Sequence, residues 1–173
     1  MAKECIGGIH VKKILVLLTL PLLLTQCAQK SYVLNESTFF LVMTNIQYYP
    51  EEYLNKDITF DCFTYELVDT SGEKYLCCVR KCSSGFGCKC GKDTIIGFIV
   101  SQDLGLPEPK NQYENTNEKS WVHVTGQIES IEKTEFTIFG ADNTAEQVSF
   151  LSFRIDEFEL IEDYSNLHYY VEK

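Results

Sequence analysis

A succession of short runs rich in β-branched and aromatic residues fills the chain from residue 55 to residue 173, and this pattern constrains the fold more than any other feature. The predicted strands cover residues 58–67, 74–80, 94–100, 121–129 and 148–161. Turn-forming residues at 69–72 join the first two strands into a hairpin. Residues 101–120, which contain Pro107 and Pro109, have no periodicity and predict a long surface connection between the third and fourth strands.

Five main strands with one long interruption match a small closed Greek-key barrel of the OB type, in which a helix or loop fills the gap after the third strand. The main alternative is a seven-stranded sandwich, whose turns are usually spaced more regularly. Gly97, inside the third strand, predicts a bulge or a close approach of two backbones. We therefore predict a mostly β protein. Residues 55–173 form one OB-like barrel, and residues 27–54 form a linker or N-terminal extension, in which 44–49 fits a strand or a helical turn equally well.

The first 26 residues have the organisation of a signal peptide. Lys3, Lys12 and Lys13 precede the uncharged run 14–24, which contains 11 residues. A helix that spans a membrane needs roughly 20 apolar residues, so this run is too short to cross. We therefore expect residues 1–26 to direct export and to be removed, which places the rest of the chain outside the cytoplasm.

The sequence Leu24-Thr25-Gln26-Cys27 resembles the processing box of bacterial lipoproteins, in which a leucine stands three positions before a cysteine that becomes acylated. Gln26 departs from the small residue that usually precedes that cysteine. The resemblance implies a lipid on Cys27 and attachment of the mature protein to the cell envelope. Ordinary cleavage near Cys27, which would give a secreted protein, and an uncleaved N-terminal anchor are the alternatives.

Six of the eight cysteines follow the processing site and are the main candidates for chemistry. They are Cys62, Cys77, Cys78, Cys82, Cys88 and Cys90. An even number of cysteines in an exported chain predicts disulfides, and Cys62 would face Cys77 or Cys78 across the hairpin. Clustered thiolates beside glycines could instead bind a thiophilic metal such as zinc, although the spacing is not that of a zinc finger. Thiol–disulfide exchange is a third possibility, but no C-x-x-C motif is present. Because adjacent residues of a strand point to opposite faces, only one of Cys77 and Cys78 is expected in a given site.

The remaining residues do not indicate an enzyme or a nucleic-acid-binding protein. A formal net charge of −10 repels phosphate backbones and acidic lipid headgroups. The sequence contains no G-x-S-x-G, no H-E-x-x-H and no phosphate-binding loop between a strand and a helix. His123 lies within a predicted strand, where a satisfied ring is the usual state. We predict a binding module that is not an enzyme, with no certain cofactor and zinc as the candidate.

Several segments also resemble the soluble carboxy-terminal domain of the YcgQ-type bacterial proteins of unknown function. They are residues 57–65, 75–79, Cys90 with Asp93, 97–100, 121–128 and 169–171. The most specific segment is the W-V-x-V-x-G-x-I strand at 121–128, a pattern common in OB-like barrels. The proteins of this family pair the domain with a membrane part and are associated with a predicted permease. The resemblance therefore implies an envelope or membrane partner. This chain differs at 88–93, where the family has adjacent cysteines and then an Ala-Asp pair, and it carries an export signal in place of membrane helices.

Overall fold

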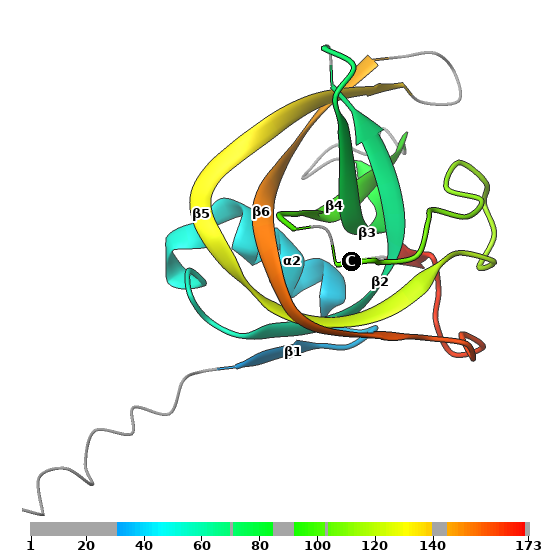
Figure 1. Ribbon diagram of the computed structural model, residues 1–173, viewed down its shortest axis with the longest axis horizontal. Helices are drawn as coiled ribbons and strands as arrows, with labels where there is room; N and C mark the ends of the chain where they lie inside the picture. Colours follow the sequence, from blue (N-terminus) through cyan, green and yellow to red (C-terminus); the bar gives the residue numbers. More distant parts are fainter. Residues whose placement is uncertain (1–30, 70, 85–91, 103, 140–144, 172–173) are drawn as a thin grey trace, which may run out of the picture. The chain divides into compact units, whose positions relative to one another are not determined.

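The computed structural model describes residues 31–69, 71–84, 92–102, 104–139 and 145–171, which belong to one compact unit (Figure 1). Its elements are β1 (Tyr32–Leu34), α2 (Phe39–Tyr48), the 3-10 helix η2 (Pro50–Glu52), β2 (Ile58–Val68), β3 (Lys74–Ser84), β4 (Lys92–Val100), β5 (Trp121–Phe139), β6 (Ala145–Leu160) and β7 (Tyr170–Val171). Within these residues, no helix is both long enough and apolar enough to span a bilayer.

Five of the strands close into a ring. The sheet has the order β1-β2-β5-β6-β4-β3-β7, and an additional pairing between β2 and β3 completes the circle. The β4–β6 pair is parallel, and the other four pairs of the ring are antiparallel. The prediction of a mostly β fold with five main strands in a closed arrangement is confirmed, and the long connection does lie between the third and fourth strands of the ring.

The helix of the fold lies where the sequence left a strand and a helical turn open at 44–49. α2 covers Phe39–Tyr48, before the first ring strand, and the connection after the third ring strand contains no helix among its described residues. Residues 31–54, expected to be a linker or extension, add β1 beside β2 and bury Phe39, Met43 and Ile46 of α2. The side-chain oxygen of Asn35 accepts hydrogen bonds from the backbone N–H groups of residues 37 and 38 and so turns the chain into α2.

Two apolar clusters lie on opposite faces of the strands. The inner cluster draws side chains from all five ring strands and from α2, so it fills the ring; Phe60, Phe98 and Phe153 are packed with ring centroids 4.7–5.6 Å apart. The outer cluster takes the alternate residues of β2, β3 and β4, together with residues of β5, β6 and the C-terminal segment 161–171. The contribution of β2 to the two clusters changes after Cys62. Residues 60 and 62 belong to the inner cluster, and Phe63 is the first residue of β2 in the outer cluster.

Gly97 brings β4 close to β3, as the sequence predicted. A Cβ atom at this position would lie 2.0 Å from the backbone oxygen of Cys78 and 2.8 Å from the Cα of Val79. No side chain can occupy that space unless one of the two strands moves. The glycine is therefore required by packing between the strands.

Candidate functional site

The most distinctive polar feature lies where β2 and β3 separate. Their pairing extends from Val68 opposite Lys74 to Phe63 opposite Val79. The preceding residues of β2 pair with β1, and the following residues of β3 pair with β7. Arg80 is the next residue of β3, and it is only 1% exposed. A buried cation therefore occupies the point of separation.

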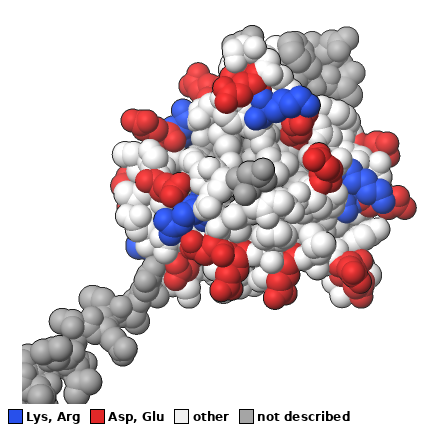
Figure 2. Space-filling model, viewed as in Figure 1, with Lys and Arg blue, Asp and Glu red and all other residues white. Residues whose placement is uncertain are grey.

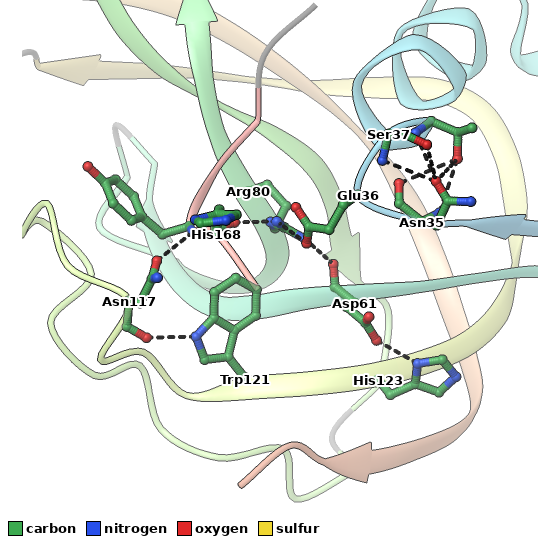
Figure 3. Close-up of polar contacts among 11 residues, drawn as sticks. Asn35, Glu36, Ser37, Asp61, Arg80, Asn117, Trp121, His123 and His168 are labelled. Carbon is green, nitrogen blue, oxygen red and sulfur yellow. Dashed lines mark hydrogen bonds and ion pairs between the residues drawn. The ribbon is translucent and has the colours of Figure 1, made fainter. Parts of the chain in front are cut away.

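Arg80 joins four parts of the chain (Figure 3). Its Nη2 donates to Glu36 Oε1 at 2.6 Å and to the backbone oxygen of His168, and its Nη1 donates to the backbone oxygen of Asp61 at 3.3 Å. The guanidinium carbon lies 5.2 Å from the ring centroid of Phe39 and 4.9 Å from that of Trp121. A buried charge is costly unless it is paired and hydrogen-bonded, and these contacts largely meet that requirement. Its Nε has no hydrogen-bond partner within the described residues.

Asn117 attaches the C-terminal segment beside this arginine. Its backbone oxygen accepts a hydrogen bond from Trp121 Nε1 at 2.8 Å, and its side-chain oxygen accepts one from the backbone N–H of Tyr169 at 2.9 Å (Figure 3). The long connection between β4 and β5 therefore holds residues 161–171 against the ring. Arg80, through His168, holds the same segment from the other side.

Asp61 links the arginine to an acid–imidazole pair on the surface. Its carboxylate Oδ1 lies 2.6 Å from His123 Nδ1, directly across the β2–β5 pairing (Figure 3). The two side chains are 32% and 44% exposed, so solvent or a partner can reach the pair. The structure thus places His123 on a strand, as predicted, with its ring bound by a carboxylate.

Further polar contacts continue from this pair along the same three strands. Thr59 and Thr125 share a hydrogen bond of 2.9 Å between their hydroxyl groups. Gln127 Nε2 donates to Asp57 Oδ1 at 2.7 Å, and Arg154 Nη2 donates to Gln127 Oε1 at 3.1 Å. We call the exposed face of β2, β5 and β6 that carries these contacts the polar rows. It consists of Asp57, Thr59, Asp61, His123, Thr125, Gln127, Arg154, Glu157 and Glu159.

The polar rows are acidic overall. Glu157 and Glu159 of β6 lie opposite Thr125 and His123 and are exposed. Arg154 is the single arginine of the polar rows, and its charge is paired with Asp156 at 3.0 Å and Glu129 at 3.5 Å. In the view of Figure 2, acidic side chains outnumber basic ones and gather along the lower edge, where β1 and the end of β6 lie in Figure 1. This surface suits a basic partner better than an anionic one.

The structure separates the predicted cysteines into two groups. Cys62, Cys78 and Cys82 belong to the inner cluster, and Cys77 belongs to the outer cluster. Cys77 and Cys78 therefore point to opposite faces, as strand alternation predicted. No disulfide joins any two of these four residues. Cys27, Cys88 and Cys90, which we predicted as the lipidation site and as part of the cysteine cluster, lie outside the described residues.

Burial makes two of these thiols poor ligands and nucleophiles. Loss of solvent raises the pKa of Cys62 and of Cys77 above the ordinary value, so both remain protonated at neutral pH. Metal ions and disulfide exchange both require the thiolate. Within the described ranges, no three His, Cys, Asp or Glu side chains are grouped so that they could hold a metal ion.

Two buried lysines hold the long connection against the outer cluster. Lys119 Nζ donates to the backbone oxygens of Asn111 and Glu114, and it lies 5.4 Å from the ring centroid of Phe63. Lys81 Nζ donates to the backbone oxygens of residues 113 and 114 at 3.3 Å. Burial, together with the charge of Lys81, lowers the pKa of Lys119 to about 8. Both ammonium groups fix the backbone of the connection, so their role is structural.

Our sequence reasoning did not identify Arg80, Lys119 or the partner of His123. A charged residue in a strand is normally exposed, and the sequence contains no signal that these two are buried. The Asp61–His123 pair could have been found only from the strand order, because the two residues are 62 positions apart in the chain.

Comparison with known proteins identifies the family. The chain matches the DUF1980 C-terminal domain over residues 22–148. No curated protein and no solved structure matches it. The resemblance to the carboxy-terminal domain of the YcgQ-type proteins is consistent with this match and is confirmed. From the match and the strand pattern together, we conclude that the chain belongs to the family of the DUF1980 C-terminal domain, a domain of unknown function.

Proposed function

We propose that this protein is a lipid-anchored binding domain of the cell envelope, which contacts an envelope or membrane protein and catalyses no reaction. Three features support the proposal: the apolar leader, the processing cysteine and the family to which the chain belongs. The partner would be a membrane protein such as a permease.

The shortness of the tether is the observation that carries the proposal. Tyr32 is the first residue of β1, only five residues after Cys27. The backbone N–H of Tyr32 donates to the oxygen of Asp57 at 2.8 Å, so the chain is part of the sheet from this residue on. Five residues span at most about 18 Å when fully extended. A lipid on Cys27 would therefore keep the domain next to the bilayer, within reach of proteins embedded in it.

The polar rows are the surface that such a partner would contact. They are exposed, their side chains are already ordered by mutual hydrogen bonds, and they carry an excess of carboxylates. Pre-ordered side chains lower the entropic cost of binding. A basic loop of a membrane protein would complement this charge, whereas a nucleic acid would be repelled.

The anchor is tested by exchanging single cysteines. We expect the wild-type chain to incorporate labelled palmitate and to sediment with membranes, and Cys27→Ala to lose both properties. Cys5→Ala is the matched control, because Cys5 lies in the segment that is removed, and it should behave as wild type. Equal labelling and fractionation of the Cys27→Ala chain would contradict the proposal.

The contact surface is tested by placing a photo-crosslinking amino acid at Thr125, within the polar rows, or at Glu73, in the exposed turn between β2 and β3. We expect a membrane protein to be crosslinked from position 125 and not from position 73. The crosslink should disappear when Cys27→Ala releases the domain from the membrane. Equal crosslinking from both positions would show that the polar rows are not the contact surface.

Metal handling beside a permease and thiol–disulfide exchange are the alternative functions. Both need thiolates, and burial disfavours the thiolates of Cys62 and Cys77. Elemental analysis of protein purified anaerobically in a reducing buffer separates these alternatives from the proposal. We expect no stoichiometric zinc, and one zinc per chain would instead support metal handling.

A further inference from the structure

Cys62 and Cys78 form a buried pair of thiols where β2 and β3 separate. Both side chains are 0% exposed and belong to the inner cluster. Phe63, opposite Val79, is the last residue of β2 that pairs with β3, so Cys62 lies just beyond the paired stretch and Cys78 just within it. The register places Cys62 and Cys78 as diagonal neighbours on the inner face of the two strands, and the Cys62 thiol lies 3.8 Å from the backbone oxygen of Val122. The two thiols are therefore neighbours on adjacent strands, shielded from water.

The other described cysteines are placed differently. Cys77 points to the outer face, where its sulfur lies 3.8 Å from the backbone oxygen of Tyr75. It could approach Cys62 only if β3 turned over, because successive residues of a strand point to opposite faces. Cys82 lies where β3 has left β2 and pairs with Val171 of β7. Cys78 is thus the described cysteine best placed to react with Cys62.

We propose that Cys62 and Cys78 form a disulfide when the chain folds in the presence of a small-molecule disulfide such as oxidised glutathione. One cysteine thiolate attacks the oxidant, which gives a mixed disulfide and releases one glutathione thiol. The second cysteine then displaces the other glutathione and forms the Sγ–Sγ bond. The protein loses two electrons and two protons, and the oxidant is reduced to two thiols. This proposal does not depend on the anchor or on a partner protein.

The position of the pair in the sheet brings the two thiols close, but a small movement of β2 is needed before the bond can form. Diagonal neighbours on adjacent strands have Cα atoms about 7–8 Å apart, whereas a disulfide needs at most about 6.8 Å. β2 must therefore move slightly at Cys62, which lies beyond Phe63, the last residue paired with β3, and which is paired with Val122 of β5 on its other side. Burial also raises the pKa of Cys62, so the thiolate is scarce in the folded chain. The bond therefore forms during folding, before the ring closes.

Tryptic peptide mapping tests the pairing directly. The full chain, purified in detergent under reducing conditions, is unfolded, refolded in a glutathione redox buffer, alkylated and digested without reduction. Peptide 57–74 contains Cys62 as its single cysteine, and peptide 75–80 contains Cys77 and Cys78. We expect these two peptides to be linked and to separate after reduction. Fluorescence of Trp121, the single tryptophan, reports whether each sample has refolded.

Two variants show which cysteine of peptide 75–80 is used. The link should persist in Cys77→Ser and disappear in Cys78→Ser. The proposal is overturned if Cys62 is alkylated in the refolded wild-type chain, or if peptide 57–74 is linked to peptide 82–89 or 90–92. A link that survives in Cys78→Ser and is lost in Cys77→Ser would overturn it as well. The wild-type map decides the question even if a variant does not refold.

Discussion

The outside of the strand ring has two regions with opposite character. The polar rows, on β2, β5 and β6, are exposed to solvent and hydrogen-bonded within themselves. The outer cluster, on β2, β3 and β4, is apolar and is covered by the connection 101–120 and the C-terminal segment 161–171. β2 belongs to both regions and changes from one to the other between Asp61 and Phe63.

The difference shows that one strand can serve two purposes when its neighbours change. Before Cys62, one face of β2 is buried and the other carries the polar rows; from Phe63 to Tyr65, both faces are buried. An apolar face that is not needed for binding must be shielded from water. Here two segments of the same chain, the connection 101–120 and the C-terminal segment 161–171, shield it, and we call them the cover. Arg80, Lys81, Lys119 and Asn117 hold that cover in place. The polar rows need no cover and remain open to a partner.

Removal of the buried arginine should have the largest effect. Arg80→Ala leaves Glu36 and two backbone oxygens without their donor and opens a cavity, and we expect a loss of about 3–5 kcal/mol in the free energy of unfolding. Arg154→Ala, in the polar rows, is the matched control and should change stability little, because Arg154 is exposed. Guanidinium unfolding followed by Trp121 fluorescence measures both. Equal losses in the two variants would contradict the contrast between the regions.

Truncation of a leucine within the cover should lower the free energy of unfolding more than truncation of a leucine outside it. Leu167 is buried in the outer cluster at 9% exposed, whereas Leu160 is 61% exposed. We expect Leu167→Ala to lose about 2–3 kcal/mol and to increase amide hydrogen exchange in residues 161–171. Leu160→Ala should do neither. If exchange in the segment stayed slow in Leu167→Ala, the segment would not be held by this contact.

The lysine that fastens the cover should make stability depend on pH. The pKa of Lys119 falls from 10.5 to about 8 in the folded chain. Between these values the unfolded chain binds more protons than the folded one, so stability rises as the pH rises. The groups that face Lys119 are Lys81, Glu114 and the ring of Tyr169. The thiols of Cys62 and Cys77, whose pKa burial raises, act in the opposite direction as the pH approaches 9.5, and they do so in every variant that keeps them. We therefore expect the wild-type chain to gain roughly 1–2 kcal/mol relative to Lys119→Met between pH 7.5 and pH 9.5.

This range of pH avoids tyrosine ionisation. Burial raises the pKa of Tyr65 above its ordinary value of 10, which removes stability only as the pH passes that value. Lys74→Met, which replaces an exposed lysine, should keep the pH dependence of the wild-type chain. Identical pH profiles for wild type and Lys119→Met would show that this lysine does not titrate within the range.

The smallest effect on stability is expected in the polar rows. Asp61→Asn removes the charge beside His123, and because both side chains are partly exposed we expect a loss below about 1 kcal/mol. The same change should reduce crosslinking from position 125 to the membrane partner. A large loss of stability with unchanged crosslinking would assign the pair to the fold and not to binding.

The ring could be predicted from the sequence because its strands have a clear pattern of alternation. The turn at 69–72 and the length of the connection at 101–120 were enough to predict the first hairpin and the place of the long connection. For α2 the sequence could not decide between a strand and a helical turn, because its sequence FFLVMTNIQY is apolar on nearly every side and its burial comes from contacts with distant strands. The opposite placement of Cys77 and Cys78 was predictable, because it follows from the alternation of side chains along a single strand.

The site was less predictable, because it depends on contacts between residues far apart in the chain. Arg80 receives its partners from Glu36, Asp61 and His168, and none of these is a sequence neighbour. Local sequence describes Arg80 and Lys119 only as charged residues, which are usually exposed. Their burial follows from the order of the strands and from the path of the two covering segments.

The intact mass of the protein extracted from its own membrane tests the central claim most directly. The account predicts a chain that begins at Cys27 and carries the added mass of a lipid, as expected of an anchored envelope domain. A full-length chain that retains residues 1–26 without a lipid, or one that is recovered in the soluble cytoplasmic fraction, would contradict it.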